Sequence, residues 1–150
     1  MSRIHVEASR IVDAPADAVY QFLRDYRERH PSILPPESFL AYTVEAGGIG
    51  AGTVVSFRIR AGGRERFYRI RVSEPDPGHV LQEQDTESSL TTTFTLTPVE
   101  GGARTNVRIA TWWQGGGGIG GFFERTFAPA ALRGIYTREL DRLAAALKEQ

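Results

Sequence analysis

The sequence predicts an α+β fold, in which a curved, seven-stranded and mostly antiparallel sheet wraps around a long C-terminal helix, with one or two short helices after the first strand. Three observations support this. From Phe122 to Gln150, apolar residues recur at steps of three and four, which gives one continuous stripe. Between Phe39 and Trp113 they recur at every second position, as in strands with one buried face. Most turns between these strands are too short for crossover helices, so neighbouring strands should run antiparallel.

The composition is ordinary for a globular protein and predicts one domain over residues 1–150. Lysine plus arginine and aspartate plus glutamate number 18 each, and a net charge of zero argues against a nucleic-acid partner. The absence of cysteine excludes disulfides, zinc–thiolate sites and cysteine nucleophiles. The first residues lack a signal-peptide pattern and no stretch is long enough for a membrane span, so we expect a cytoplasmic protein.

A strand and a short helix are predicted at the start of the chain. Ile4, Val6 and Ala8 alternate with polar residues, as in a strand with one buried face. Pro15 suits the first turn of a helix, where its missing N–H costs no hydrogen bond. The apolar face of that helix consists of Val19, Phe22, Leu23 and Tyr26.

Six further strands are predicted from alternation and turn chemistry. They are Phe39–Glu45, Thr53–Ala61, Arg64–Ser73, Val80–Asp85, Ser89–Thr97 and Thr105–Trp113. The turns between them are rich in glycine and proline, most clearly at Gly47–Gly52 and Pro75–Gly78. No linker divides the series, which favours a single sheet.

The predicted C-terminal helix contains a proline. The apolar stripe comprises Leu132, Ile135, Tyr136, Leu140, Leu143, Ala144 and Leu147. Pro129 would kink a helix that continued through it. We therefore expect Leu132–Leu147 to pack firmly on the sheet and Ile119–Ala128 to be the part that could swing and gate a cavity.

Three pieces of the chain carry a resemblance: the segment from Ile11 to Tyr20, the hairpin series with its glycine-rich turn after the second strand, and the terminal amphipathic helix. Together they resemble the START-like (SRPBCC) superfamily of helix-grip proteins, described as polyketide cyclase/dehydrase and lipid transport, which includes the plant Bet v 1 proteins. The resemblance covers essentially the whole chain. It implies that an apolar ligand is held between sheet and helix, without a cofactor.

Most motifs that could indicate chemistry are weak. Gly116–Gly121 matches G-x-G-x-x-G but no βαβ unit follows, so we interpret it as a connector. The glycines at 47–52 are similarly weak evidence for phosphate binding, although both loops could be mobile lips of a cavity. The three histidines show no ligand spacing, and no metal site is expected. His30 could line a cavity mouth, but we favour a partly exposed position at the helix end.

Strand parity decides the role of two carboxylates. If Glu83 and Asp85 faced the helix, burial would raise their pKa values and suit them to acid–base chemistry. If they faced outward, they could pair with arginines of the neighbouring strands. We slightly favour the outward orientation, although Leu81 argues against it. The arginines themselves are interpreted as a solvated sheet back: Arg58, Arg60, Arg69 and Arg71.

The inner face of the sheet supplies the candidate ligand-binding residues. They are Tyr42, Phe57, Tyr68, Thr92, Phe94, Trp113, Phe123, Phe127 and Tyr136. The pattern alone fits either a packed aromatic core or a cavity with apolar walls and a few polar groups. The resemblance favours the cavity.

The leading functional hypothesis is a monomeric or homodimeric binding protein for an apolar or aromatic small molecule, such as a lipid or polyketide. We favour it over an enzyme. The first alternative is an aromatase/cyclase, with Tyr42, Tyr68, His30 or a buried acid moving protons. The second is a chaperone-like partner-binding module, as in the Hsp90-activator relatives that the resemblance admits.

Overall fold

The computed structural model describes residues 3–61, 63–114 and 128–148. Its elements follow the predicted order of strand, helices, six strands and a long helix. They are β1 (Arg3–Val12), α1 (Ala16–Arg24), α2 (Arg29–Ser32), β2 (Phe39–Ala46), β3 (Val54–Ala61), β4 (Arg64–Asp76), β5 (Val80–Asp85), β6 (Thr91–Val99), the 3₁₀ turn η1 (Glu100–Gly102), β7 (Arg104–Gln114) and α4 (Ala128–Lys148).

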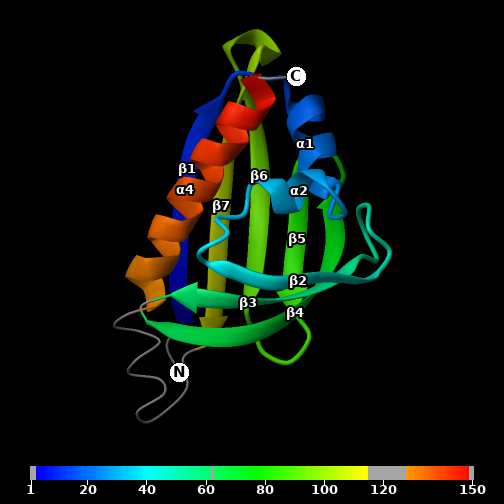
Figure 1. Ribbon diagram of the computed structural model, residues 1–150. Coiled ribbons are helices and arrows are strands. Elements are labelled where there is room, and N and C mark those ends of the chain that lie inside the picture. Colours follow the sequence, from blue (N-terminus) through cyan, green and yellow to red (C-terminus); the bar gives the residue numbers. More distant parts are fainter. Residues whose placement is uncertain (1–2, 62, 115–127, 149–150) are drawn as a thin grey trace.

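The strands form one seven-stranded sheet in the order β1-β7-β6-β5-β4-β3-β2. Every neighbouring pair is antiparallel, which confirms the prediction from the short turns. The sheet is strongly curved: β1, β7, β6 and β5 run upright in Figure 1, whereas β2, β3 and β4 run across them. The helices lie inside this curve, with α4 along β1 and α1 on β6 and β7. The α+β helix-grip fold is therefore confirmed.

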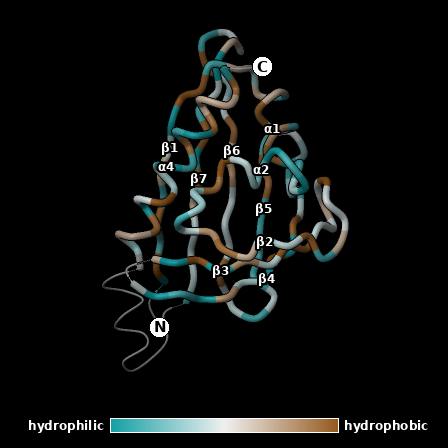
Figure 2. The backbone as a smooth tube through the Cα atoms, viewed as in Figure 1, coloured by the Kyte–Doolittle hydropathy of each residue, from teal (hydrophilic) through white to brown (hydrophobic). Residues whose placement is uncertain are grey.

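Apolar side chains of the strands and of α4 meet between these layers. Val6, Val107 and Leu143 have no exposed surface, and each lies on the face that its strand alternation or helical spacing predicts. Leu81 is also fully buried, opposite to the orientation favoured for β5. The change of hydropathy along each element is visible in Figure 2. Burial of this apolar surface is the main contribution that stabilises the packing of α4 against the sheet.

Several strand ends differ by one or two residues from the predicted ones, and the clearest differences are at the end of β4 and the start of α4. Strand β4 continues to Asp76 through an irregularity after Ser73, so the proline turn begins later than predicted. Pro129 lies in the first turn of α4 as described, where proline leaves no hydrogen bond unmade. Apart from Ala128, the segment predicted to swing, Ile119–Ala128, lies outside the described residues.

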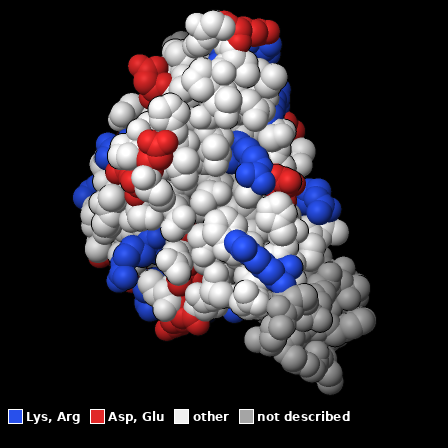
Figure 3. Space-filling model, turned by 180° about the vertical axis from the view of Figure 1, so that it is seen from behind, with Lys and Arg blue, Asp and Glu red and all other residues white. Residues whose placement is uncertain are grey.

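The outer face of the sheet carries charges of both signs. Arg58 and Arg60 contact Glu65, and Arg69 contacts Glu45. The reverse view in Figure 3 shows positive and negative groups interspersed. The interpretation of these arginines as part of a balanced, solvated surface is confirmed. Within the described residues, no helix has the length and apolar character needed to cross a membrane.

Candidate functional site: a polar cluster in an aromatic cavity

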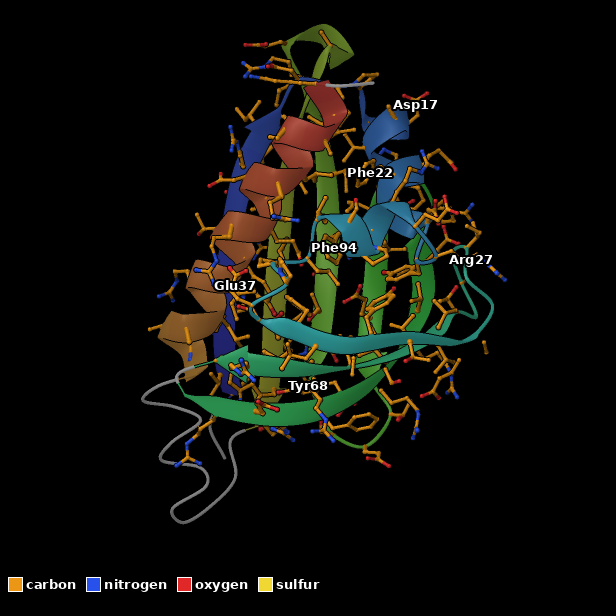
Figure 4. All side chains as sticks on the ribbon, in the orientation of Figure 1. Asp17, Phe22, Arg27, Glu37, Tyr68 and Phe94 are labelled. Carbon is orange, nitrogen blue, oxygen red and sulfur yellow. The ribbon has the colours of Figure 1, made fainter. Side chains whose placement is uncertain are left out.

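A cavity of about 50 Å³ lies between the inner face of the sheet and the helices α2 and α4. Its walls are mostly aromatic and aliphatic. The Phe57 ring stacks on Tyr42 at a centroid distance of 6.4 Å and lies tilted against Tyr68 at 6.1 Å. Figure 4 shows Phe94 on β6, at the level of α2, and Tyr68 on β4. Small-molecule sites commonly measure about 300–1,000 Å³, so a ligand of that size would require the walls to move.

The cavity includes most of the candidate residues from the sequence. Tyr42, Phe57, Tyr68, Thr92, Phe94 and Tyr136 line it. Trp113 is buried on β7 but is not part of the lining, and its indole N–H has no partner among the described residues. Phe123 and Phe127 lie outside the described residues. The two interpretations of the inner face, packed core and cavity, thus both describe part of it.

Hydrogen bonds fix several of the polar groups in the lining. The Tyr42 hydroxyl donates to the backbone carbonyl of Tyr26 at 2.6 Å, which joins β2 to the helical region. The Tyr136 hydroxyl lies 2.6 Å from the Thr111 hydroxyl, which in turn lies 2.7 Å from that of Thr92. This chain connects α4 to β7 and β6 through buried hydroxyl groups.

Glu83 faces inward, so the outward orientation favoured from the sequence is wrong. The Tyr26 hydroxyl donates to its carboxylate at 2.7 Å, and the side chain, 12% exposed, lines the cavity. Burial raises the pKa of Glu83 to about 7, against the lowering effect of the Tyr26 hydrogen bond. The buried Leu81, two residues earlier, indicated this parity correctly. A carboxyl group with such a pKa can hold or release a proton near neutral pH.

Asp85 shares the parity of Glu83 but has a structural role. It is buried at the end of β5, where its carboxylate accepts hydrogen bonds from the Arg69 backbone N–H at 3.2 Å and the Ser88 hydroxyl at 2.6 Å. These contacts anchor the turn that leads into β6. Asp85 does not line the cavity, so only Glu83 remains a candidate for acid–base chemistry.

His30 is buried rather than partly exposed, which corrects the preferred prediction. Its Nδ1–H donates to the Leu23 carbonyl at 2.6 Å, so Nε2 is the nitrogen left to face Glu83, at 3.8 Å. The ring stacks on Tyr26 at 4.5 Å and meets the edge of Phe94 at 5.3 Å. Burial lowers the pKa of His30 to about 4, so the imidazole is neutral at pH 7.

Glu139 is the site residue that the sequence analysis missed. It lies on α4, is only 2% exposed and lines the cavity. No described residue donates a hydrogen bond to its carboxyl group, and burial together with the charge of Glu83 raises its pKa well above the usual range. The signal was present in the sequence: Glu139 lies between Leu132 and Leu143 within the apolar stripe.

Another glutamate, the largely buried Glu74, holds the glycine-rich loop against α1. It accepts hydrogen bonds from the Tyr20 hydroxyl at 2.6 Å, from Arg24 at 3.1 Å and from the Ala51 backbone N–H at 2.8 Å. Gly50, at a φ of +65°, approaches this pair so closely that a Cβ atom would lie 2.2 Å from the Arg24 guanidinium. These contacts fix the loop at 47–52 to α1 and β4, against the expectation that it could be a mobile lip of the cavity.

Other kinds of site find little support in the described residues. No group of three or more histidine, aspartate or glutamate side chains is placed to hold a metal ion in that part of the chain. The large apolar side chains exposed there lie far apart in the fold: Ile11 on β1, Ile49 in the loop between β2 and β3, and Phe67 on β4. They do not form the patch that a partner-binding module would present.

Comparisons with known proteins give the family. The model for polyketide cyclase / dehydrase and lipid transport matches residues 3–148. No curated protein matches the chain. Among solved structures, the KanY protein is 32% identical, with a TM-score of 0.84 over 99% of both chains.

Two further solved structures show the likeness of the fold alone. The Zhui aromatase/cyclase from Streptomyces sp. R1128 is 18% identical, with a TM-score of 0.79 over 98% of this chain and 94% of that one. Norcoclaurine synthase from Thalictrum flavum is 16% identical, with a TM-score of 0.74 over 99% and 88%. From the match over residues 3–148, the chain belongs to the polyketide cyclase / dehydrase and lipid transport family, with its START-like helix-grip fold.

Proposed function

We propose that this protein binds an apolar or aromatic small molecule between the sheet and α4. The observation that carries the proposal is the cavity itself, in which aromatic walls surround a few inward-facing polar groups. Such a combination is typical of small-molecule sites, where apolar walls supply affinity and polar groups supply orientation. The family description, which includes lipid transport, supports the same conclusion.

The test is calorimetric titration of the protein with a fatty acid, a sterol and a flavonoid. Each ligand is also titrated into two matched variants, one altered inside the cavity and one outside it. Leu90 lines the cavity, whereas Leu40 pairs opposite the outward-facing Arg58 and does not line it. Leu90→Trp should fill the cavity and weaken binding at least tenfold, and Leu40→Trp should leave it within about twofold. Native mass spectrometry of the purified protein provides a second readout for co-purified ligand. No binding below millimolar concentration, with no retained ligand, would refute the proposal.

A second candidate, an aromatase/cyclase-type enzyme, is favoured by one specific observation. Glu83 faces the cavity with a pKa raised to about 7, beside the neutral imidazole of His30. Its carboxylate would take a proton from a carbon flanked by two carbonyl groups. That carbon would then attack another carbonyl of the same chain, and the new alkoxide would receive the proton back. The Zhui aromatase/cyclase shares the fold.

Cyclisation of a synthetic β-polyketone thioester tests this candidate. If Glu83 is the base, Glu83→Gln should lower the rate at least 100-fold, and the rate of the unaltered protein should rise with pH to a plateau above about 7. The matched control is Glu28→Gln, an exposed acid beside α2, which should leave the rate unchanged. Equal rates for both variants would exclude Glu83 as the base.

A further inference from the structure

The cavity contains two inward-facing carboxyl groups and no cationic side chain among its described lining residues. Glu83 comes from β5 and Glu139 from α4, so they approach from the two layers that enclose the space. Glu83 has one hydrogen-bond donor, Tyr26. Glu139 is 2% exposed and accepts no hydrogen bond from a described residue. Buried acids usually have a cation or several donors, whereas in the described parts of the chain this pair has only the Tyr26 hydroxyl.

Three arginines of α1 and α4 have partners elsewhere, and the exposed Arg66 of β4 lies over the Tyr68 ring, 5.2 Å from its centroid. Arg24 pairs with Glu74 at 3.1 Å, and Arg138 of α4 pairs with Glu37 at 3.4 Å. Arg142 donates to the backbone carbonyls of Ser32 and Ile33 at 3.0 and 3.1 Å. His30 is held neutral by its burial. The other titratable groups in the described lining are the hydroxyls of Tyr26, Tyr42, Tyr68 and Tyr136. Burial raises the pKa values of Tyr26, Tyr42 and Tyr136, so these three are neutral at pH 7.

We propose that the ligand of this cavity carries an organic cation, such as a protonated amine, which Glu83 and Glu139 receive while the aromatic walls hold its apolar body. This inference rests on the proposed function and adds a charge to the class of ligand. A cation would supply the partner that Glu139 lacks in the described structure. The aromatic rings of the lining, Tyr26, Tyr42 and Phe57 among them, favour a positive charge over their faces.

The proposal has a direct consequence for protons. Burial raises the pKa of Glu83 to about 7 and that of Glu139 above its usual range, so burial opposes the ionisation of both carboxyl groups before binding. A cation stabilises the ionised carboxylate, so its binding releases a proton to solvent. Affinity for an amine should therefore rise between about pH 5 and pH 8, where an alkylamine with a pKa of about 10 remains charged. A neutral ligand of the same shape should show neither effect.

Three probes with one body and different head groups test the inference: 4-phenylbutylamine, 4-phenylbutanol and 4-phenylbutyrate. Calorimetric titration at pH 7.5 should find the amine at least tenfold tighter than the alcohol and the acid. Titration in buffers with different ionisation enthalpies should show proton release for the amine alone. Glu139→Gln should bring the amine to within about threefold of the alcohol while leaving the alcohol's affinity within twofold. Glu28→Gln, the exposed control, should change neither.

The outcomes separate this inference from the proposed function. If the alcohol binds as tightly as the amine, the cavity is a binding site but the inference is wrong. If the panel of fatty acid, sterol and flavonoid and all three probes fail to bind, both are wrong. Arg125, outside the described residues, provides one more variant: if Arg125→Gln tightens amine binding tenfold or more, the chain supplies its own cation and the inference fails.

Discussion

Glu74 and Glu83 lie on neighbouring strands, their side chains are both 12% exposed, and each accepts a hydrogen bond from a tyrosine of the helical region. Their protonation nevertheless differs. The pKa of Glu74 is lowered to about 2 by hydrogen bonds from Arg24, Tyr20 and the Ala51 N–H, which outweigh its burial. The pKa of Glu83 is raised to about 7 because burial acts with only Tyr26 to oppose it.

The difference shows how the two regions of the molecule are used. Around Glu74 the chain provides a cation and a backbone donor, and the result is a closed joint between α1, the glycine-rich loop and β4. Around Glu83 it provides a cavity and a second acid, Glu139. Glu83 is the more strongly desolvated of the two, although their side chains are equally exposed. Equal side-chain exposure and a tyrosine contact therefore do not by themselves make a carboxyl group structural. The cationic partner of Glu74 gives that carboxylate a structural role. The lack of such a partner at Glu83 marks the region that is available to a ligand.

The largest expected effect comes from removing the acid of the cavity. The pKa of Glu83 is raised from 4.5 to about 7 on folding, so between these values the unfolded chain loses a proton that the folded protein keeps. The free energy of unfolding must then fall by about 3 kcal/mol as pH rises through that interval. Glu83→Gln should remove this decline and leave a protein more stable than the original at pH 8, as measured by urea denaturation at several pH values.

Glu139 complicates this measurement in a predictable way. The pKa of Glu139 is also raised, so Glu139 too makes the free energy of unfolding fall as pH rises. This part of the fall should remain in the Glu83→Gln variant. Among the original protein and these variants, the free energy of unfolding of the double variant, Glu83→Gln with Glu139→Gln, should therefore depend least on pH. A Glu83→Gln protein that is less stable than the original at pH 8 would mean that the carboxylate has a partner after all.

An effect of opposite sign is expected at Glu74. Its lowered pKa means that its contribution is complete above about pH 4.5 and is lost as pH falls toward 2. The shift corresponds to about 3 kcal/mol, which solvent screening reduces to about 2 kcal/mol. Glu74→Gln should lower the free energy of unfolding by that amount at pH 7, again by urea denaturation.

Glu45→Gln provides the matched control for this variant, because Glu45 pairs with Arg69 at 2.8 Å on the solvated face of the sheet. Exposed ion pairs contribute little, so its curve should overlay that of the original protein. If Glu74→Gln and Glu45→Gln lowered the free energy of unfolding equally, the buried contacts of Glu74 would contribute no more than an exposed ion pair. The contrast between the regions around Glu74 and Glu83 would then not hold.

The fold could be predicted from the sequence because periodicity is a property of many residues at once. Alternation along β3, β4 and β7 and the stripe on α4 each rest on several positions, so one misleading residue changes nothing. The orientation of Glu83 depended on the parity of a single short strand, β5, in which both faces carry polar residues. There the general rule that acids stay outside outweighed the evidence of Leu81, and the rule was wrong.

Glu139 and His30 could not be assigned for a different reason. A charged residue within an apolar helical stripe can be noticed, but whether it has a partner depends on side chains from distant segments. Glu139 shares the cavity lining with Glu83, and His30 is neutral because its ring is buried. Such environments are set by tertiary packing, which leaves no local pattern. The aromatic lining itself was predicted because it follows strand alternation.

The smallest expected effect comes from removing the tyrosine hydroxyls. These variants test whether Arg24 or the tyrosines cause the difference in pKa between Glu74 and Glu83. Tyr20→Phe leaves Glu74 with Arg24 and the Ala51 N–H, so its pKa should stay below 4.5, whereas Tyr26→Phe removes the hydrogen bond that lowers the pKa of Glu83 and should move it above 7. Each lost hydrogen bond should cost about 1 kcal/mol of stability. Titration of the glutamate carboxyl carbons by NMR measures both pKa values. The contrary outcome is that Tyr20→Phe returns Glu74 to an ordinary pKa while Tyr26→Phe leaves the pKa of Glu83 unchanged. In that case the hydroxyl of Tyr20, and not the guanidinium of Arg24, would cause the difference in pKa between the two glutamates.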